Sequence, residues 1–319
     1  MESFTELGMD RRPSLSKGHY TEHIARLAAA CNWLGIKRGR ATQYGKLMRE
    51  FFEDEARSKH HILAYGESCE IVDLFELWEH RATDFPGLAR KIKGVFRKGP
   101  LLCEEEHPAT ASPSNRARND AFSYLVAGRL LAAGVPVVAV DSMLMRGAAC
   151  ASEADVTFQW HETLIDIECK RPHSYAALGK RMQEARTQLQ RPSRGGRPGV
   201  IALDCSVLIR PAGTLLESGS GEAATHRIWT ELEHSVAWRV ESYLTHAMLG
   251  FLFFARVPAM TRVSPSSALP MQGEAMHDFR PDSISTWLVY SNACYTGPDV
   301  LRCLADQLLA TQDTAMSHD

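Results

Sequence analysis

The stretch LIDIECKRPHS, residues 164–174, combines the apolar pattern of a strand with charges that a buried strand rarely carries. Its leucine and isoleucines are typical of a strand that packs into a core, yet Asp166, Glu168 and Lys170 interrupt them. Burying a charge is costly unless the charge is paired or binds a metal ion. The pattern therefore predicts a strand whose charged face has a chemical role.

A second strand is predicted just before this one, at residues 154–160, joined to it by a two-residue turn. If the two strands pair around that turn, Asp155 lies opposite Glu168, with Cβ atoms about 5 Å apart. Alternation along the strand places Lys170 on the same face as Glu168. Asp166 shares this face but lies toward the turn, and we expect it to be solvated; the alternative is that it contacts and supports the residues of the site. Two carboxylates this close repel each other unless they share a proton or a cation.

These residue types suit a hard divalent cation, Mg²⁺ with Mn²⁺ as the alternative. Mg²⁺ takes oxygen ligands, keeps several waters and often binds through one or two carboxylates plus a substrate phosphate. Lys170 would then orient or help deprotonate a metal-bound water, and could balance the charge of the scissile phosphate. The competing interpretation of Asp155, Glu168 and Lys170 is a set of surface ion pairs on an exposed hairpin.

A basic segment follows the charged strand directly. Residues 171–197 contain seven Arg or Lys and one acid, so seven minus one gives +6 within a chain of formal net charge −2. Such a segment attracts a phosphate polymer without regard to its sequence. Candidate nucleic-acid contacts are Arg171, Lys180, Arg181 and Arg186. The alternative is a solvated helix face, which is the usual role of a run of charges.

The order of predicted elements from residue 116 indicates the fold class. A helix is followed by three strands, a second helix with an apolar stripe at 175–190, and a buried strand at 200–207. A long helix near 222–246 and apolar strands near 249–255 and 285–291 come later. This order predicts a mixed central sheet flanked by helices, an α/β or α+β core.

The sequence divides into three predicted parts. Residues 1–103 carry helical apolar stripes, residues 104–115 have the Pro, Ser and Ala content of a linker, and residues 116–319 form the sheet-containing domain. The start of the chain has no signal-peptide pattern, and the longest apolar stretches are too short to span a bilayer. The eight cysteines are scattered without a Cys-x-x-Cys pair, which indicates reduced thiols. We therefore expect a cytoplasmic protein that does not bind membranes.

Asp155, followed by Glu168-x-Lys170 on the next strand, between a helix and a basic helix, resembles the PD-(D/E)XK nuclease superfamily, the restriction-endonuclease-like enzymes. The stretch IECKRPHS, a helix ending in QL and then GVIALD resembles bacterial members especially closely. The resemblance covers about residues 116–207. It implies a restriction-endonuclease-like fold in which Asp155, Glu168 and the carbonyl of Cys169 hold the metal and Lys170 is the catalytic lysine.

The same resemblance implies a metal-dependent nuclease, with DNA a better candidate substrate than RNA, acting in defence against foreign DNA or in DNA processing. The rival hypothesis is a decayed nuclease fold that serves as a nucleic-acid-binding or assembly module. No G-x-x-x-x-G-K-[ST] loop is present, so any ATP-driven step would need a partner protein. A homodimer also remains open.

Two positions depart from the family pattern. Many relatives carry a glutamate after a phenylalanine on the first core helix, whereas Phe122 is followed here by Ser123. Asp120 or Asn119, about one turn earlier, is the candidate replacement for that acid. Some relatives carry Gln-x-x-x-Tyr on the second helix; this pattern is absent here, and Gln188 is the candidate polar neighbour of the site.

Overall fold

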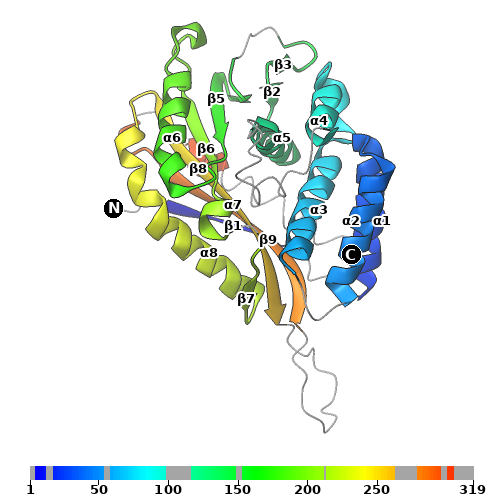
Figure 1. Ribbon diagram of the computed structural model, residues 1–319. Coiled ribbons are helices and arrows are strands. Elements are labelled where there is room, and N and C mark those ends of the chain that lie inside the picture. The colour runs from blue at the N-terminus through cyan, green and yellow to red at the C-terminus, as the bar shows by residue number, and fades with distance from the viewer. Residues whose placement is uncertain are drawn as a thin grey trace.

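The computed structural model is a mixed α/β structure in which helices cover both faces of one open sheet (Figure 1). It describes residues 4–11, 17–53, 58–97, 116–148, 153–211, 213–262, 279–295 and 300–304. The predicted mixed sheet with flanking helices and the mostly helical N-terminal part are both confirmed. The predicted linker at 104–115 lies outside the described residues.

The sheet contains both parallel and antiparallel pairs. Along it the strands follow the order β1-β9-β8-β6-β5-β4-β2-β3, and β7 pairs with β8. Strands β5, β6 and β8 run parallel to one another, while β4 and β9 pair with their neighbours in antiparallel fashion. The strands are β1 (Phe4–Arg11), β2 (Val137–Val140), β3 (Met143–Leu144), β4 (Val156–Trp160), β5 (Thr163–Lys170), β6 (Gly199–Asp204), β7 (Leu216–Ser218), β8 (Met248–Arg262) and β9 (Phe279–Ser291).

The helices separate into two layers, with the strands between them in Figure 1. Helices α1 to α5 share an apolar core with one face of the sheet, and α6 and α8 share a second core with the other face. The α-helices are α1 (Lys17–Leu34), α2 (Arg38–Glu53), α3 (Lys59–Trp78), α4 (Leu88–Arg97), α5 (Arg116–Ala132), α6 (Tyr175–Leu189), α7 (Ser206–Ile209) and α8 (Gly221–Ser235). Short 3₁₀ turns are η1 (Arg81–Asp84), η4 (Pro192–Arg194), η5 (Ala237–Arg239) and η6 (Glu241–Tyr243).

The N-terminal helices pack directly on the helix that precedes the sheet. Trp78 at the end of α3 is fully buried, and its indole Nε1 donates to the carbonyl of Tyr124 on α5 at 2.9 Å. The two helices approach so closely at Gly128 that a Cβ there would lie 2.9 Å from the Cβ of Leu77. Because no side chain separates the helices at this point, the apolar core is continuous from the N-terminal helices into the sheet.

Two elements differ from the sequence predictions. The first residues of the chain form β1, which pairs with β9 instead of belonging to a helix. Its partner lies more than 270 residues away, and no local pattern reports such a pairing. The long helix predicted near 222–246 ends at Ser235. Beyond it, i→i+3 bonds such as Tyr243 N–H to the Val240 carbonyl at 2.9 Å continue in short 3₁₀ turns, which explains the helix-like spacing.

Within the described residues, none of the helices combines the length and the apolar character needed to cross a lipid bilayer.

Candidate active site

The predicted hairpin forms with the predicted register. Strand β4 pairs antiparallel with β5 from Trp160 opposite Thr163 to Val156 opposite Ile167. The two-residue turn has His161 in the left-handed region, at φ 51°. The apolar face of the hairpin is buried against the α5 side, as expected from alternation. Asp155 is the residue just before β4, so it lies at the end of the ladder beside the last residues of β5.

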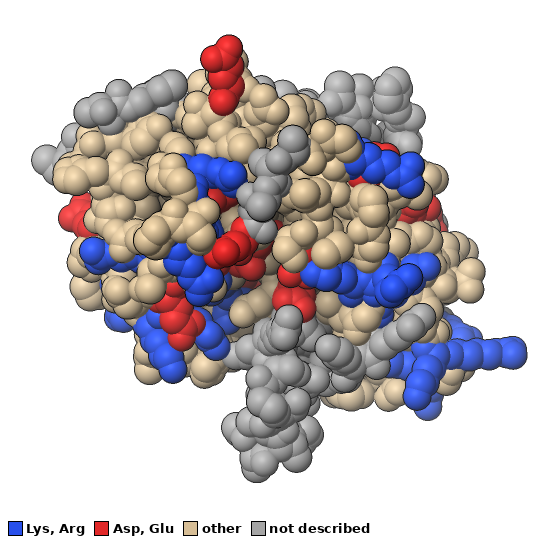
Figure 2. Space-filling view, turned by 90° about the horizontal axis from the view of Figure 1, so that it is seen from above, with Lys and Arg blue, Asp and Glu red and all other residues tan. Residues whose placement is uncertain are grey.

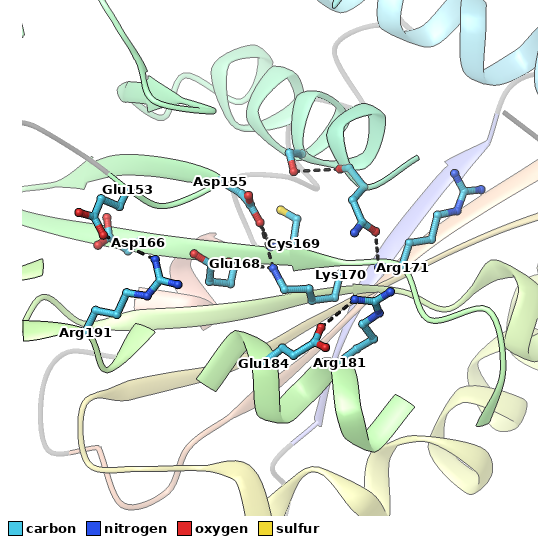
Figure 3. Close-up of polar contacts among 12 residues, drawn as sticks. Glu153, Asp155, Asp166, Glu168, Cys169, Lys170, Arg171, Arg181, Glu184 and Arg191 are labelled. Carbon is cyan, nitrogen blue, oxygen red and sulfur yellow. Dashed lines mark hydrogen bonds and ion pairs between the residues drawn. The ribbon is translucent and has the colours of Figure 1, made fainter. Parts of the chain in front are cut away.

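Asp155 contacts the end of β5 through one carboxylate oxygen. Its Oδ2 accepts from the backbone N–H of Cys169 at 2.8 Å and lies 3.4 Å from Lys170 Nζ (Figure 3). Burial and the nearby charge of Glu168 raise the pKa of Asp155 to about 6, although Lys170 and the Cys169 N–H act in the opposite direction. The ionised form of Asp155 is therefore unfavourable in this environment, and an added cation would stabilise it.

Glu168 and Lys170 lie on the α6 side of the sheet. In the parallel β5–β6 pair they stand beside Ile201 and Leu203, which belong to the α6 core. Lys170 Nζ is 2.8 Å from Glu168 Oε2, and Glu168 is only 1% exposed. Burial acts to lower the pKa of Lys170, but Asp155 and Glu168 outweigh it and the pKa is raised. Lys170 is thus a cation held between two carboxylates.

The remaining oxygen of Glu168 is held by an arginine that the sequence analysis did not single out. Arg194 Nη2 forms a short ion pair with Glu168 Oε1, and Arg194 Nη1 lies 3.7 Å from Asp166 Oδ2. Arg194 belongs to the basic segment, but its charge alone could not distinguish it from six neighbours of the same sign. Both oxygens of Glu168 therefore contact cations of the chain itself.

The expectation that Asp166 is solvated is wrong. Asp166 is 1% exposed, and its Oδ1 accepts from Thr157 Oγ1 at 2.6 Å and lies 3.7 Å from Arg197 Nη1. The loop after α6 folds back over this part of the hairpin and covers a face that would otherwise meet water. Because a buried carboxylate needs partners, the loop supplies two arginines to it, Arg194 and Arg197.

The first core helix contributes polar atoms other than a carboxylate. Asn119 Oδ1 accepts from the backbone N–H of Arg171 at 3.1 Å, and Ser123 Oγ donates to the Asn119 carbonyl at 3.0 Å. Burial and the charge of Asp155 raise the pKa of Cys169 well above its usual value, although the nearby Ser123 acts in the opposite direction. Ser123 thus lies on α5 at the position where the resemblance predicts an acid, while Asp120 is partly buried in the first turns of α5.

Arg171 differs from the other candidate nucleic-acid contacts because its side chain is buried. It is 6% exposed, and it extends away from Lys170 toward the α3 side of the sheet (Figure 3). Its guanidinium lies 3.4 Å from Glu70 of α3 and 3.0 Å from Asp204 at the end of β6. Alternation explains this, since odd-numbered residues at the end of β5 face α3 and α5. Arg171 is therefore an internal link and not a surface contact for phosphate.

The candidate contacts on α6 differ in how accessible they are. Lys180 is exposed, whereas Arg181 is partly buried and pairs with Glu184 at 2.7 Å (Figure 3). Arg186 and Gln188 are partly buried, and one buried polar atom of each makes no hydrogen bond within the described residues. Lys180 is thus the α6 cation best placed to meet a ligand in solvent.

A pocket lies on the opposite side of β5 and β6 from the buried Glu168 carboxylate. It lies between α3, α5 and β8, and its lining includes Arg171, Asp204 and Arg256 but not Asp155, Glu168 or Lys170. Its apolar walls are Phe122 and Phe254, whose rings stack on each other at 5.8 Å. The pocket is therefore separate from the charged end of the hairpin.

The hairpin end offers oxygen ligands of the type that Mg²⁺ prefers, but it offers few of them. Asp155 and Glu168 supply carboxylates, and the Cys169 carbonyl points to the Asp155 side because N–H and C=O of one strand residue share a side. Within the described part of the chain, no group of three or more His, Cys, Asp or Glu side chains could hold a metal ion. A bound ion would depend on two carboxylates, a carbonyl and water.

Searches of protein-family models, of curated proteins and of solved structures found no match to this chain.

Proposed function

We propose that this protein is a metal-dependent nuclease of restriction-endonuclease-like fold that hydrolyses phosphodiester bonds, with DNA as its first candidate substrate. The observation that supports the proposal is the meeting of two carboxylates, Asp155 and Glu168, at the ammonium of Lys170. Asp155 directly precedes β4, whereas Glu168 and Lys170 belong to β5, and a structural ion pair would need only one of the two acids. The arrangement agrees with the roles that the sequence motif implies.

In this proposal Asp155, Glu168 and the Cys169 carbonyl hold Mg²⁺ or Mn²⁺. The ion, when bound, polarises the phosphate and lowers the pKa of a water molecule. The ammonium of Lys170 lies 2.8 Å from Glu168 and 3.4 Å from Asp155, so it stands beside both proposed ligands. We therefore assign to Lys170 the stabilisation of negative charge on the attacked phosphate and the orientation of the water.

The basic side chains of the surface support a polyanionic substrate. Figure 2 shows Lys and Arg on either side of a group of acidic side chains on one face of the molecule. Basic surface groups attract a phosphate backbone. Sequence-independent contact is the mode that such a distribution favours.

One observation favours the rival hypothesis of a binding or assembly module without activity. The two oxygens of Glu168 are already held by Lys170 and Arg194, so the carboxylate has its charge balanced without a metal ion. A module of this kind would bind nucleic acid and leave it intact.

The test is cleavage of labelled duplex DNA, single-stranded DNA and RNA by the full chain with Mg²⁺, with Mn²⁺ and with EDTA. We expect cleavage that needs the divalent ion and falls by about 10²-fold or more in Asp155→Asn, which loses the carboxylate charge. Glu22→Gln, an exposed charge removal on α1, serves as the matched control. Binding without cleavage of any substrate would support the module, and equal cleavage by Asp155→Asn would refute the assigned site.

Lys180→Gln is expected to weaken DNA binding without changing its sequence preference. Lys180 is exposed on α6, so its loss removes one phosphate contact and lowers the slope of log affinity against log salt by about 1. Fluorescence anisotropy between low and moderate salt measures both quantities. Arg227→Gln on α8 is the control, because this exposed arginine lies beside Glu231, 3.5 Å away. An unchanged salt slope would remove Lys180 from the interface.

A further inference from the structure

Arg194 is the only residue of the loop 191–196 that points inward. Arg191, Pro192, Ser193, Gly195 and Gly196 are exposed, whereas Arg194 is 4% exposed. The turn that produces this is short: Gly195 N–H bonds to the Pro192 carbonyl at 3.1 Å, and Gly195 and Gly196 have φ of 64° and 72°. Two consecutive residues in the left-handed region favour glycine, and the tight turn that they form places the Arg194 side chain under α6.

The guanidinium of Arg194 ends among acidic groups and not in an apolar core. It pairs with Glu168 Oε1, lies 3.7 Å from Asp166 and donates to the Glu153 carbonyl at 3.3 Å. Its Nε and Nη1 are buried and make no hydrogen bond within the described residues. Arg194 thus uses only part of its donor set at this position, and a metal ion that balanced the charge of Glu168 would offset the loss of its pairing there.

We propose that Arg194 is an internal cation that competes with the divalent ion for Glu168, so that metal binding displaces Arg194 and loosens the loop at 191–197. The inference rests on the metal site of the proposed function. Glu168 already contacts two cations, Lys170 and Arg194, so a divalent ion would be a third positive group at one buried carboxylate, and their mutual repulsion favours the loss of one of them. Lys170, which contacts the other oxygen, remains in place as the reaction requires.

The neighbouring arginines distinguish competition from a general effect of positive charge. Arg191 is exposed and pairs at 3.7 Å with Glu153, and Arg197 lies near Asp166. Arg194, in contrast, pairs with Glu168. Arg194→Gln removes the positive charge that pairs with Glu168 and keeps a polar side chain. Arg191→Gln and Arg197→Gln each remove one arginine charge from the same loop and serve as controls.

The experiment measures Mn²⁺ binding to the full chain without substrate, by electron paramagnetic resonance of free Mn²⁺. We expect Arg194→Gln to bind Mn²⁺ about tenfold more tightly than the wild type, the effect of removing one buried competing charge. Arg191→Gln and Arg197→Gln are expected to stay within about twofold. If Arg194→Gln folds poorly, Arg194→Lys keeps the charge on a flexible stem, and its Mn²⁺ affinity should lie between the two.

Hydrogen exchange of the wild type gives a second measurement that needs no substitution. Addition of Mg²⁺ should speed exchange of the peptide containing residues 191–197, since release of Arg194 removes the buried anchor of that loop. Unchanged exchange together with unchanged Mn²⁺ affinity in Arg194→Gln would overturn the competition while leaving the metal site intact. Absence of Mn²⁺ binding in the wild type and in every variant would overturn the metal site and the competition together.

Discussion

Lys170→Met is expected to lower metal-dependent cleavage by about 10³-fold while leaving the divalent ion bound. The ammonium lies 2.8 Å from Glu168 and 3.4 Å from Asp155, and it is the one cation that contacts both proposed ligands among the described residues. Methionine keeps much of the volume of the buried stem but removes the charge that would stabilise the attacked phosphate. Removal of one such group from an active site costs about 10²–10³-fold in rate.

Single-turnover cleavage with saturating enzyme measures this effect, because it separates the chemical step from binding. Lys46→Met is the matched control, since Lys46 is exposed on α2 near Glu50 and far from β5 in the sequence. Mn²⁺ affinity measured in parallel should be equal to or tighter than that of the wild type, because a positive charge has left the site. Cleavage by Lys170→Met at the wild-type rate would exclude Lys170 from the reaction.

Arg171→Met is expected to lower the free energy of unfolding by about 3–5 kcal/mol, the cost of leaving buried charges without their partner. Its guanidinium bridges Glu70 of α3 and Asp204 of β6, both buried. The substitution would leave two carboxylates facing each other across the boundary between the N-terminal helices and the sheet. Urea unfolding followed by circular dichroism measures the loss.

Arg181→Met is the matched control for Arg171→Met. Both arginines belong to the same basic segment, but Arg181 pairs with Glu184 near the surface, where an ion pair contributes at most about 1 kcal/mol. We expect the free energy of unfolding of Arg181→Met to lie within about 1 kcal/mol of the wild-type value. Equal stability of Arg171→Met, combined with weaker DNA binding, would show that Arg171 contacts the nucleic acid and not the interior.

The hairpin and its register could be read from the sequence because both depend on local rules. Apolar residues alternate in both strands, and a one-residue shift would turn the apolar face of β5 toward the wrong core. The same alternation put Glu168 and Lys170 together on one face, and the register placed Asp155 beside the end of β5. A mixed sheet flanked by helices likewise followed from the succession of helices and strands along the chain, although the order of the strands in the sheet did not.

Which charges are buried was decided only by the tertiary structure. Asp166, Arg171 and Arg194 belong to a charged stretch that is typical of a solvated surface, yet each is at most 6% exposed. Their burial depends on elements far along the chain or on a loop that folds back, namely α3 for Arg171 and the turn after α6 for the other two.

A sequence pattern therefore determined the strand pair and the proximity of Asp155, Glu168 and Lys170, because period and register are properties of neighbouring residues. The partners that balance these charges were not determined in this way. The sequence does not distinguish an arginine that is solvated from one that pairs with a buried carboxylate. Only the tertiary packing brings Arg194 to Glu168 and Arg171 to Asp204.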